Sequence, residues 1–127
     1  MPWTLTLHAD AGYIETVYAG QLTPAELNAS VQENLRVAQR ESLYRFLSDC
    51  STLQGGHSIL DLYAVTDQLD VLRGKSTREA LLMPQLEAMQ KDVRFWEDAC
   101  VNRGFTVRVF RAREPALGWL LDPQPGD

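Results

Sequence analysis

Apolar residues follow two different spacings along this chain, and each change of spacing predicts a new element. Trp3, Leu5 and Leu7 alternate with polar residues, which is the period of a strand with one buried face. A turn at 10–12 separates this segment from 13–18, where β-favouring residues return. The chain therefore begins with a predicted β-hairpin.

A helical spacing follows the hairpin. Thr23, Pro24 and Glu26 suit the N-cap, first and third positions of a helix, where they form a capping box with a proline that needs no N–H. One face of the following segment is apolar, with Leu27, Val31, Leu35 and Ala38. We expect this helix to pack on a sheet and to end within 40–42.

The next segments predict a strand, a loop and a second helix. The strand covers 43–49, and a polar loop covers 50–57. Ser58 and Asp61 form a second capping pair, and Gly74 ends the helix that they begin. The residues expected on the buried face of this helix are Ile59, Leu62, Tyr63, Thr66 and Leu69.

The segment 77–83 supports two interpretations. Its Arg, Glu, Ala, Leu and Met residues favour a helix. Pro84, however, disfavours helical geometry at Met83, and 80–83 is continuously apolar, as in a short buried strand. We predict a strand, because a helix here would place two helices in succession and leave the sheet one strand short.

The last third of the chain predicts a helix, a strand and a closing helix. The first helix begins within 86–90 and ends at Gly104, since glycine accepts the left-handed conformation of a helix end. The strand covers 105–111 and is expected to be buried on both faces in the middle of the sheet. Pro115 suits the first turn of the closing helix, and 122–127 has the composition of a flexible tail.

This order of elements predicts one α/β domain over 1–121. The first two strands pair antiparallel, and the later strands are joined by helical crossovers that imply parallel pairing. The sheet is therefore mixed, with about five strands in a single layer. No repeat, low-complexity tract or interdomain linker divides the chain.

Composition narrows the classes of partner. The chain has a net charge of −5 and a pI near 5.0, which argues against nucleic acid as a partner because phosphate binding needs a basic surface. No apolar run reaches the length of a membrane span. With no signal peptide, Cys50 and Cys100 are expected to be reduced thiols with small, buried side chains. We expect a cytoplasmic protein.

Candidate chemistry is sparse. Asp49, Ser51, His57 and Asp61 could gather at the carboxyl edge of the sheet, where a serine–histidine pair would suggest a hydrolase. No nucleophile elbow or oxyanion-hole sequence accompanies them, and Ser58 has a simpler interpretation as an N-cap. The two histidines and the single glycine pair predict no metal site and no phosphate-binding loop. We therefore assign no catalytic, metal-binding or cofactor-binding residue.

Aromatic residues offer a different hypothesis. Phe95, Trp96, Phe110 and Trp119 could line a cavity for an apolar ligand or lipid. The alternative is ordinary core packing at helix and strand spacing. An open apolar cavity beside Trp96 and Trp119 would favour the ligand-binding interpretation.

Three segments carry a resemblance to a known family. The first is the end of the chain, where an apolar strand ending in Phe-Arg and a charged turn precede the pattern Ala-x-x-Trp-Leu at 116–120. The second is the preceding helix, with Arg94-Phe95 and the glycine stop at 102–104. The third is the strand up to Asp49 with its polar loop and amphipathic helix. On these residues the chain resembles the SpoIIAA-like, or STAS/SEC14-type, family of small bacterial α/β proteins along nearly its whole length.

The resemblance implies a mixed sheet with helices packed mainly on one face. Its best-understood members are anti-sigma-factor antagonists, which are not enzymes, bind a partner kinase and are switched by phosphorylation of a serine at the start of the second helix. The residue nearest to that serine here is Ser58. This chain departs from the family pattern, because 55–58 lacks the Asp-Ser-Ser-Gly context of the switch.

We therefore predict a non-enzymatic, protein-binding regulatory module. Its partner-contact or phosphorylation loop is expected to include Asp49, Ser51, His57 and Ser58. The partner is another protein, or a second copy of this chain in a homodimer. Two alternatives remain open: a module that binds a lipid or a small apolar ligand, and a hydrolase that uses a Ser/His pair.

Overall fold

The computed structural model describes residues 2–123, and its elements follow the predicted order. The strands are β1 (Trp3–His8), β2 (Tyr13–Gln21), β3 (Arg45–Gly55), β4 (Arg78–Leu82) and β5 (Thr106–Phe110). The helices are α1 (Pro24–Glu41), α2 (Ile59–Val65), α3 (Glu87–Asn102) and α4 (Arg113–Leu120), with a 3₁₀ helix, η1 (Thr66–Leu72), directly after α2. The predicted tail lies mostly outside the described residues.

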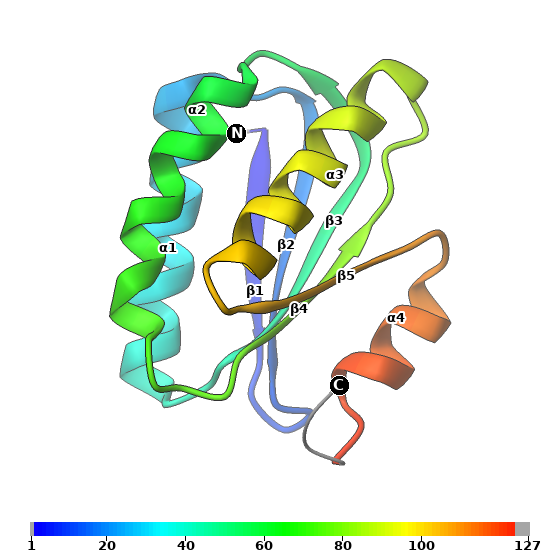
Figure 1. Cartoon of the computed structure of the whole chain (residues 1–127). Coiled ribbons are helices and arrows are strands. Elements are labelled where there is room, and N and C mark those ends of the chain that lie inside the picture. The colour runs from blue at the N-terminus through cyan, green and yellow to red at the C-terminus, as the bar shows by residue number, and fades with distance from the viewer. Residues whose placement is uncertain (1, 124–127) are drawn as a thin grey trace.

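The sheet has the order β1-β2-β3-β4-β5 (Figure 1). β1 pairs antiparallel with β2, and the four strands from β2 to β5 are parallel. The predicted mixed five-stranded sheet is therefore confirmed, and so is the strand that we preferred over a helix at 77–83. The prediction that the last strand lies in the middle of the sheet is wrong. β5 is an edge strand, with Arg108 exposed and Val109 and Phe110 only half-buried.

Alternate residues of the sheet build two separate cores, because successive side chains in a strand point to opposite faces. On the face covered by α1, α2 and α3 the core includes Ile14, Phe46, Leu81 and Val107. On the opposite face α4 is the only helix of residues 2–123, and it packs in a core with Tyr13, Leu47, Ala80, Leu82, Ala116 and Leu120. The helices therefore lie mainly on one face, as the resemblance implied.

The second helix packs mainly on other helices rather than on the sheet. α1 lies over β1 and β2, and α3 lies against β5 and β3, while α2 and η1 rest mainly on α1 and α3. We call residues 59–72, which bridge α1 and α3, the roof. This placement leaves Ile59 and Tyr63 exposed, contrary to the prediction, whereas Leu62 and Thr66 are buried as predicted.

The third strand is longer than predicted. It begins at Arg45 and continues to Gly55, so most of the expected polar loop belongs to the strand. Its polar residues alternate with Cys50 and Leu53, which are buried in the core under α1 and α3. In this segment β3 remains paired with β2, although the register shifts between Val17 and Ala19 and between Gly20 and Gln21. The segment 50–55 therefore forms a strand with some buried side chains, although its polar composition predicted a loop.

Local signals at the helix ends are confirmed. Thr23 with Glu26, and Ser58 with Asp61, form complete capping boxes at the starts of α1 and α2. Gly104 follows α3 in a left-handed conformation with φ of 93°. No helix in the described part of the chain has the length and apolar character needed to cross a membrane.

Candidate functional site

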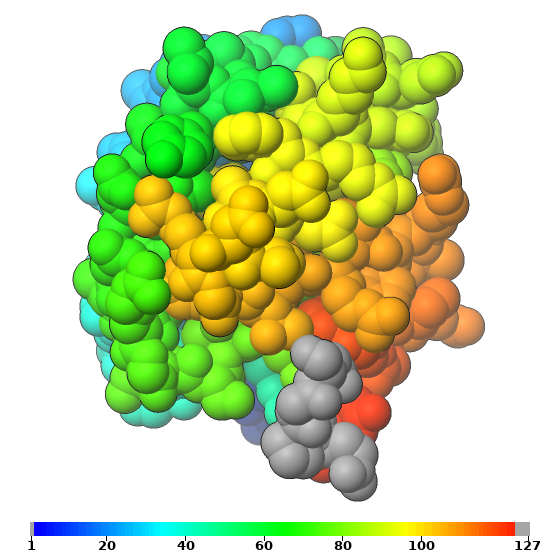
Figure 2. Space-filling model, viewed as in Figure 1, coloured from blue at the N-terminus to red at the C-terminus, as the bar shows by residue number. Residues whose placement is uncertain are grey.

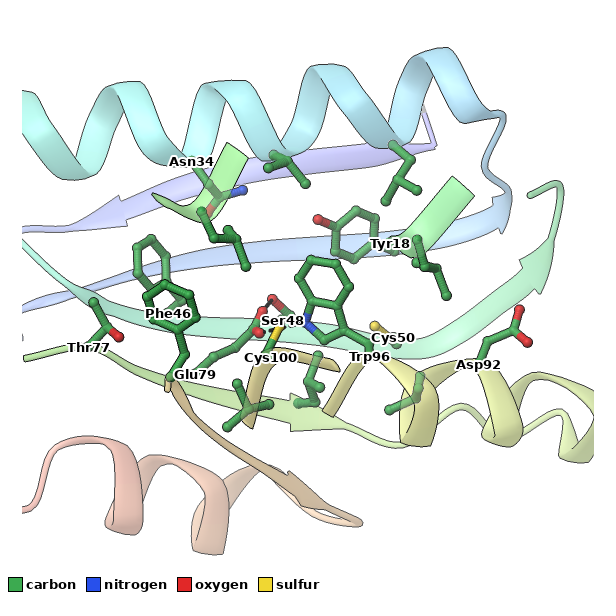
Figure 3. A pocket seen from close by; sticks show the side chains of 18 of the residues that line it. Tyr18, Asn34, Phe46, Ser48, Cys50, Thr77, Glu79, Asp92, Trp96 and Cys100 are labelled. Atoms are coloured by element: carbon green, nitrogen blue, oxygen red, sulfur yellow. Dashed lines mark hydrogen bonds between the residues drawn. The ribbon is translucent and has the colours of Figure 1, made fainter. Parts of the chain in front are cut away.

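A cavity of about 120 Å³ lies between the sheet and the helices on the α1–α3 face (Figure 3). Its floor is the sheet, with Tyr18, Phe46, Cys50 and Leu81. Its sides are α1 and α3, and the roof closes it through Leu62, Leu69 and Leu72. From outside, side chains of the roof and of α3 meet over most of this face (Figure 2). The cavity therefore lies between the sheet, α1, α3 and residues 62–72.

One carboxyl group lies within this mainly apolar cavity. In β4, Glu79 and Leu81 point to the cavity, while Arg78 and Ala80 point to the other face. Ser48 Oγ donates a hydrogen bond of 2.7 Å to Glu79 Oε2, and Trp96 Nε1 donates one of 2.8 Å to Oε1. The labelled side chains of Ser48, Glu79 and Trp96 point toward one another in Figure 3.

Burial raises the pKa of Glu79, and the two hydrogen bonds from Ser48 and Trp96 only partly oppose this shift. The residue still keeps some accessible surface. Glu79 is one of the residues that line the cavity. Among the described residues no basic side chain forms an ion pair with Glu79. A buried carboxyl group without a cationic partner is uncommon and marks a candidate binding site.

Three other titratable side chains around the cavity are kept neutral by burial. Burial raises the pKa of Tyr18, Cys50 and Cys100, and all three line the cavity. Both cysteines are free and buried, as predicted, so neither is a reactive thiolate. The described residues include no cluster of His, Cys, Asp and Glu that could hold a metal ion.

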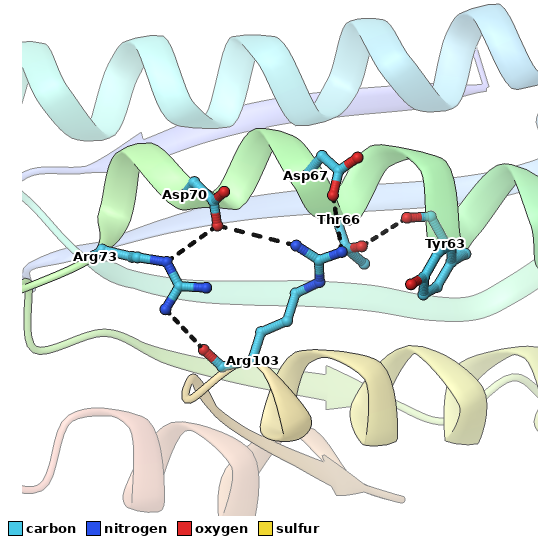
Figure 4. Close-up of polar contacts among 6 residues, drawn as sticks. All are labelled: Tyr63, Thr66, Asp67, Asp70, Arg73 and Arg103. Carbon is cyan, nitrogen blue, oxygen red and sulfur yellow. Dashed lines mark hydrogen bonds and ion pairs between the residues drawn. The ribbon is translucent and has the colours of Figure 1, made fainter.

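Polar contacts hold the roof on both sides. On the α3 side, Arg103 Nη2 lies 2.8 Å from Asp67 Oδ1, its Nη1 lies 3.9 Å from Asp70 Oδ1, and its guanidinium stacks over the ring of Tyr63 (Figure 4). On the α1 side, the Gln68 amide donates to Asn28. The roof is therefore attached to α1 and α3 by side chains at its surface, above the leucines that close the cavity.

The four residues predicted for the contact loop do not form one cluster. Ser51 Oγ donates to Asp49 Oδ1 over 2.6 Å, a contact between two residues of β3. Ser58 exchanges hydrogen bonds with Asp61 at the start of α2. His57 Nδ1 lies 3.0 Å from the Leu22 carbonyl oxygen. Of the four, only His57 lines the cavity.

The glycine pair before His57 has a packing explanation. Gly56 has a φ of 101°, and a Cβ there would lie 2.6 Å from backbone atoms of Leu22. Only glycine allows the loop after β3 to approach the loop after β2 so closely. In the described residues no hydrogen bond joins His57 to Ser51 or Ser58. The Ser/His pair of the hydrolase hypothesis is therefore not assembled in this conformation.

The four aromatic candidates separate between the two faces. Trp96 lines the cavity, and Phe95 packs against the core beside it. Phe110 and Trp119 pack on the α4 face, with ring centroids 5.7 Å apart. The residue that the sequence analysis missed is Glu79. Its signal was present, because a strand at 78–82 places this charged residue on the same face as Leu81.

Comparison with known proteins adds the fold. No protein-family model matches the sequence, and no curated protein is significantly similar to it. The chain is similar to the crystal structure of an uncharacterised protein of the DUF3478 family with a SpoIIAA-like fold, from Shewanella loihica PV-4. The TM-score is 0.60 with 21% sequence identity, over 93% of this chain and 91% of the other. The domain therefore has a SpoIIAA-like fold, as its resemblance indicated.

Proposed function

We propose that this domain is a binding module without catalytic activity, and that it holds a small, mainly apolar molecule beneath the roof. The cavity of about 120 Å³ carries the proposal. Protein interiors are usually close-packed, with few voids larger than a water molecule. An engineered apolar cavity of about 150 Å³ binds benzene. A molecule with one ring, or a short branched chain, therefore suits this space.

The lining supports binding rather than reaction. Most of the side chains around the cavity are apolar, and the Tyr18 hydroxyl is already engaged with Ser30 Oγ at 3.1 Å. The two thiols are buried and neutral. Such a surface provides shape and dispersion contacts for a ligand, with Glu79 as its main polar feature.

Binding of a neutral one-ring molecule tests the proposal. Toluene is titrated into the labelled protein while the indole N–H signals of Trp96 and Trp119 are followed by NMR. We expect the Trp96 signal to shift and the Trp119 signal, from the opposite face, to remain in place. Val93→Phe should fill the cavity and abolish the shift. Leu117→Phe, on the α4 face, is the matched control. Absence of any Trp96 response would contradict the proposal.

A second function, contact with a protein partner, is favoured by the outer surface of the roof. Ile59, Leu60 and Tyr63 are 43%, 78% and 55% exposed, respectively, so α2 presents apolar side chains to solvent. Neighbouring exposed apolar residues often belong to an interaction surface. Ser58 precedes them directly, and a phosphate there would lie at the start of α2. Of the four residues predicted for the contact loop, Ser58 borders this surface.

A photo-reactive residue at position 60 tests this second function in the native cell. We expect one recurrent crosslinked protein, absent when the same probe replaces Arg36 on the exposed side of α1. The identified protein should then bind the purified domain, and Leu60→Glu should weaken that complex at least tenfold. Equal crosslinking from both positions would count against a specific surface on α2.

A further inference from the structure

We propose that the cavity selects a ligand whose apolar body carries a protonated amine, and that the carboxylate of Glu79 recognises this amine. The inference rests on the proposed function, in which the cavity binds a small apolar molecule, and it adds the chemical class of that molecule. Its basis is the position of one carboxyl group that faces the cavity without a cationic partner.

The carboxyl group of Glu79 retains capacity for a ligand. Its oxygens accept one hydrogen bond each, from Ser48 Oγ and Trp96 Nε1. A carboxylate offers about four lone-pair sites, so acceptor positions remain. The two existing bonds fix the orientation of the group, and it lines the cavity. An ammonium group entering the cavity would therefore meet an oriented acceptor.

The charges around the cavity favour a cation over an anion. Asp92 also lines the cavity, which adds a second acidic residue. Arg78 is among the residues that line the cavity, but its side chain points to the other face, where the guanidinium donates to the carbonyl oxygens of Trp119 and Asp122 near the end of α4. The Ser48 and Trp96 donors are already directed at Glu79. An ammonium would therefore favour the ionised form of Glu79 and pair with it, whereas a carboxylate ligand would oppose that form.

The same sheet contains a carboxyl group that the protein pairs by itself. Glu15 points to the α4 face and accepts hydrogen bonds of 2.7 and 3.0 Å from the Arg113 guanidinium, and His8 Nε2 lies 2.9 Å from its Oε1. Glu79 has no such cation among the described residues. Glu15 therefore provides the matched control for a test of Glu79.

The test compares four probes of one ring: benzylamine, benzyl alcohol, toluene and benzoate. Their affinities are measured near neutral pH from the Trp96 indole N–H signal, in the parent protein and in Glu79→Gln and Glu15→Gln. We expect benzylamine to bind about tenfold more tightly than benzyl alcohol, because a hydrogen bond to an ionised group is stronger than one between neutral groups. Benzoate should bind most weakly.

The variants separate this inference from the proposed function. In Glu79→Gln the preference for benzylamine should fall to about twofold or less, while toluene binds as before, which also shows that the variant is folded. Glu15→Gln should keep the full preference. If toluene binds but benzylamine is not preferred, or if Glu79→Gln keeps the preference, the inference is wrong and the proposed function stands. If no probe binds, the proposed function fails and the inference fails with it.

Discussion

Two glutamates on opposite faces of the sheet have opposite environments. Glu15, on the α4 face, is paired with Arg113 and His8, and the Arg113 hydrogen bonds lower its pKa despite partial burial. Glu79, on the α1–α3 face, receives two hydrogen bonds from neutral donors, and burial raises its pKa. The two carboxyl groups differ in the cations beside them and in how strongly burial desolvates them, although the residue type and the sheet are the same.

The two faces of the sheet also differ in how closely their side chains pack. On the α4 face, Ala80, Ala116 and Leu120 are fully buried, and Arg45 and Arg78 donate to carbonyl oxygens at the end of α4. These bonds satisfy groups that a helix end leaves without partners. On the other face the roof encloses a cavity. One face of the sheet is therefore closely packed. The cavity is confined to the other face, between the sheet, α1, α3 and the roof.

The largest effects should come from replacing each glutamate by glutamine and measuring the free energy of unfolding against pH. Glu15 has a lowered folded-state pKa, so it stabilises the protein above the ordinary value of 4.5, and this contribution is lost as pH falls through the folded pKa. Glu15→Gln should therefore lose about 2–3 kcal/mol near neutral pH and approach the parent in acid.

Glu79→Gln should show the opposite dependence. A raised folded-state pKa means that the contribution of Glu79 is complete below 4.5 and is lost as pH rises through the folded pKa. Glutamine imitates the protonated acid at every pH, so the variant should match the parent in acid and become more stable than the parent as pH increases. Urea unfolding at several pH values gives the free energy of unfolding of both variants. If this free energy changed with pH in the same way in both variants, the two glutamates would not have opposite environments.

A somewhat smaller effect is expected from adding side-chain volume on each face. Ala116→Leu inserts atoms into the close-packed α4 core and should lower the free energy of unfolding by about 2 kcal/mol. Val93→Leu adds one methylene beside the cavity and should change it by less than about 1 kcal/mol, or increase it. Thermal or urea unfolding gives both values. Equal losses would mean that the cavity cannot accept the added atoms.

Ser58→Ala should have an effect near 1 kcal/mol. The hydroxyl group accepts a hydrogen bond from the Asp61 backbone N–H in the capping box of α2, and loss of an N-cap typically has this cost. Toluene binding should remain, because Ser58 does not line the cavity. Thr23→Ala, at the start of α1, is a matched cap substitution. A loss of ligand binding in Ser58→Ala alone would connect the cap to the cavity.

Features that depend on neighbouring residues could be predicted from the sequence. The capping boxes at Thr23 and Ser58 need partners only three residues away, so the starts of α1 and α2 were clear. The strand at 78–82 followed from Pro84 together with the order of elements. These signals, with the two apolar periods, defined the fold class.

Features that depend on distant contacts could not be predicted in the same way. The hydrogen-bond donors to Glu79 are 31 and 17 residues away in the sequence, so no local pattern indicated a buried carboxyl group. The apolar period of α2 showed that one side would be buried but not that it would face other helices. Tyr63 was therefore assigned to the wrong side. The edge position of β5 depends in the same way on pairing between distant strands.

The smallest effect on stability should come from Arg103→Ala, although its effect on ligand exchange should be clear. Arg103 joins the end of α3 to the roof, but Asp67 and Asp70 are mostly exposed, and exposed ion pairs contribute at most about 1 kcal/mol. Without this contact the roof should open more often, since local opening requires the loss of only a few contacts. We expect faster hydrogen exchange in 59–72 and faster dissociation of toluene, while its affinity changes little. Arg36→Ala removes a comparable exposed pair with Glu33 on α1 and should leave both rates unchanged. Equal rates in the two variants would mean that the roof is held by its buried leucines alone, and that access to the cavity does not depend on its polar surface contacts.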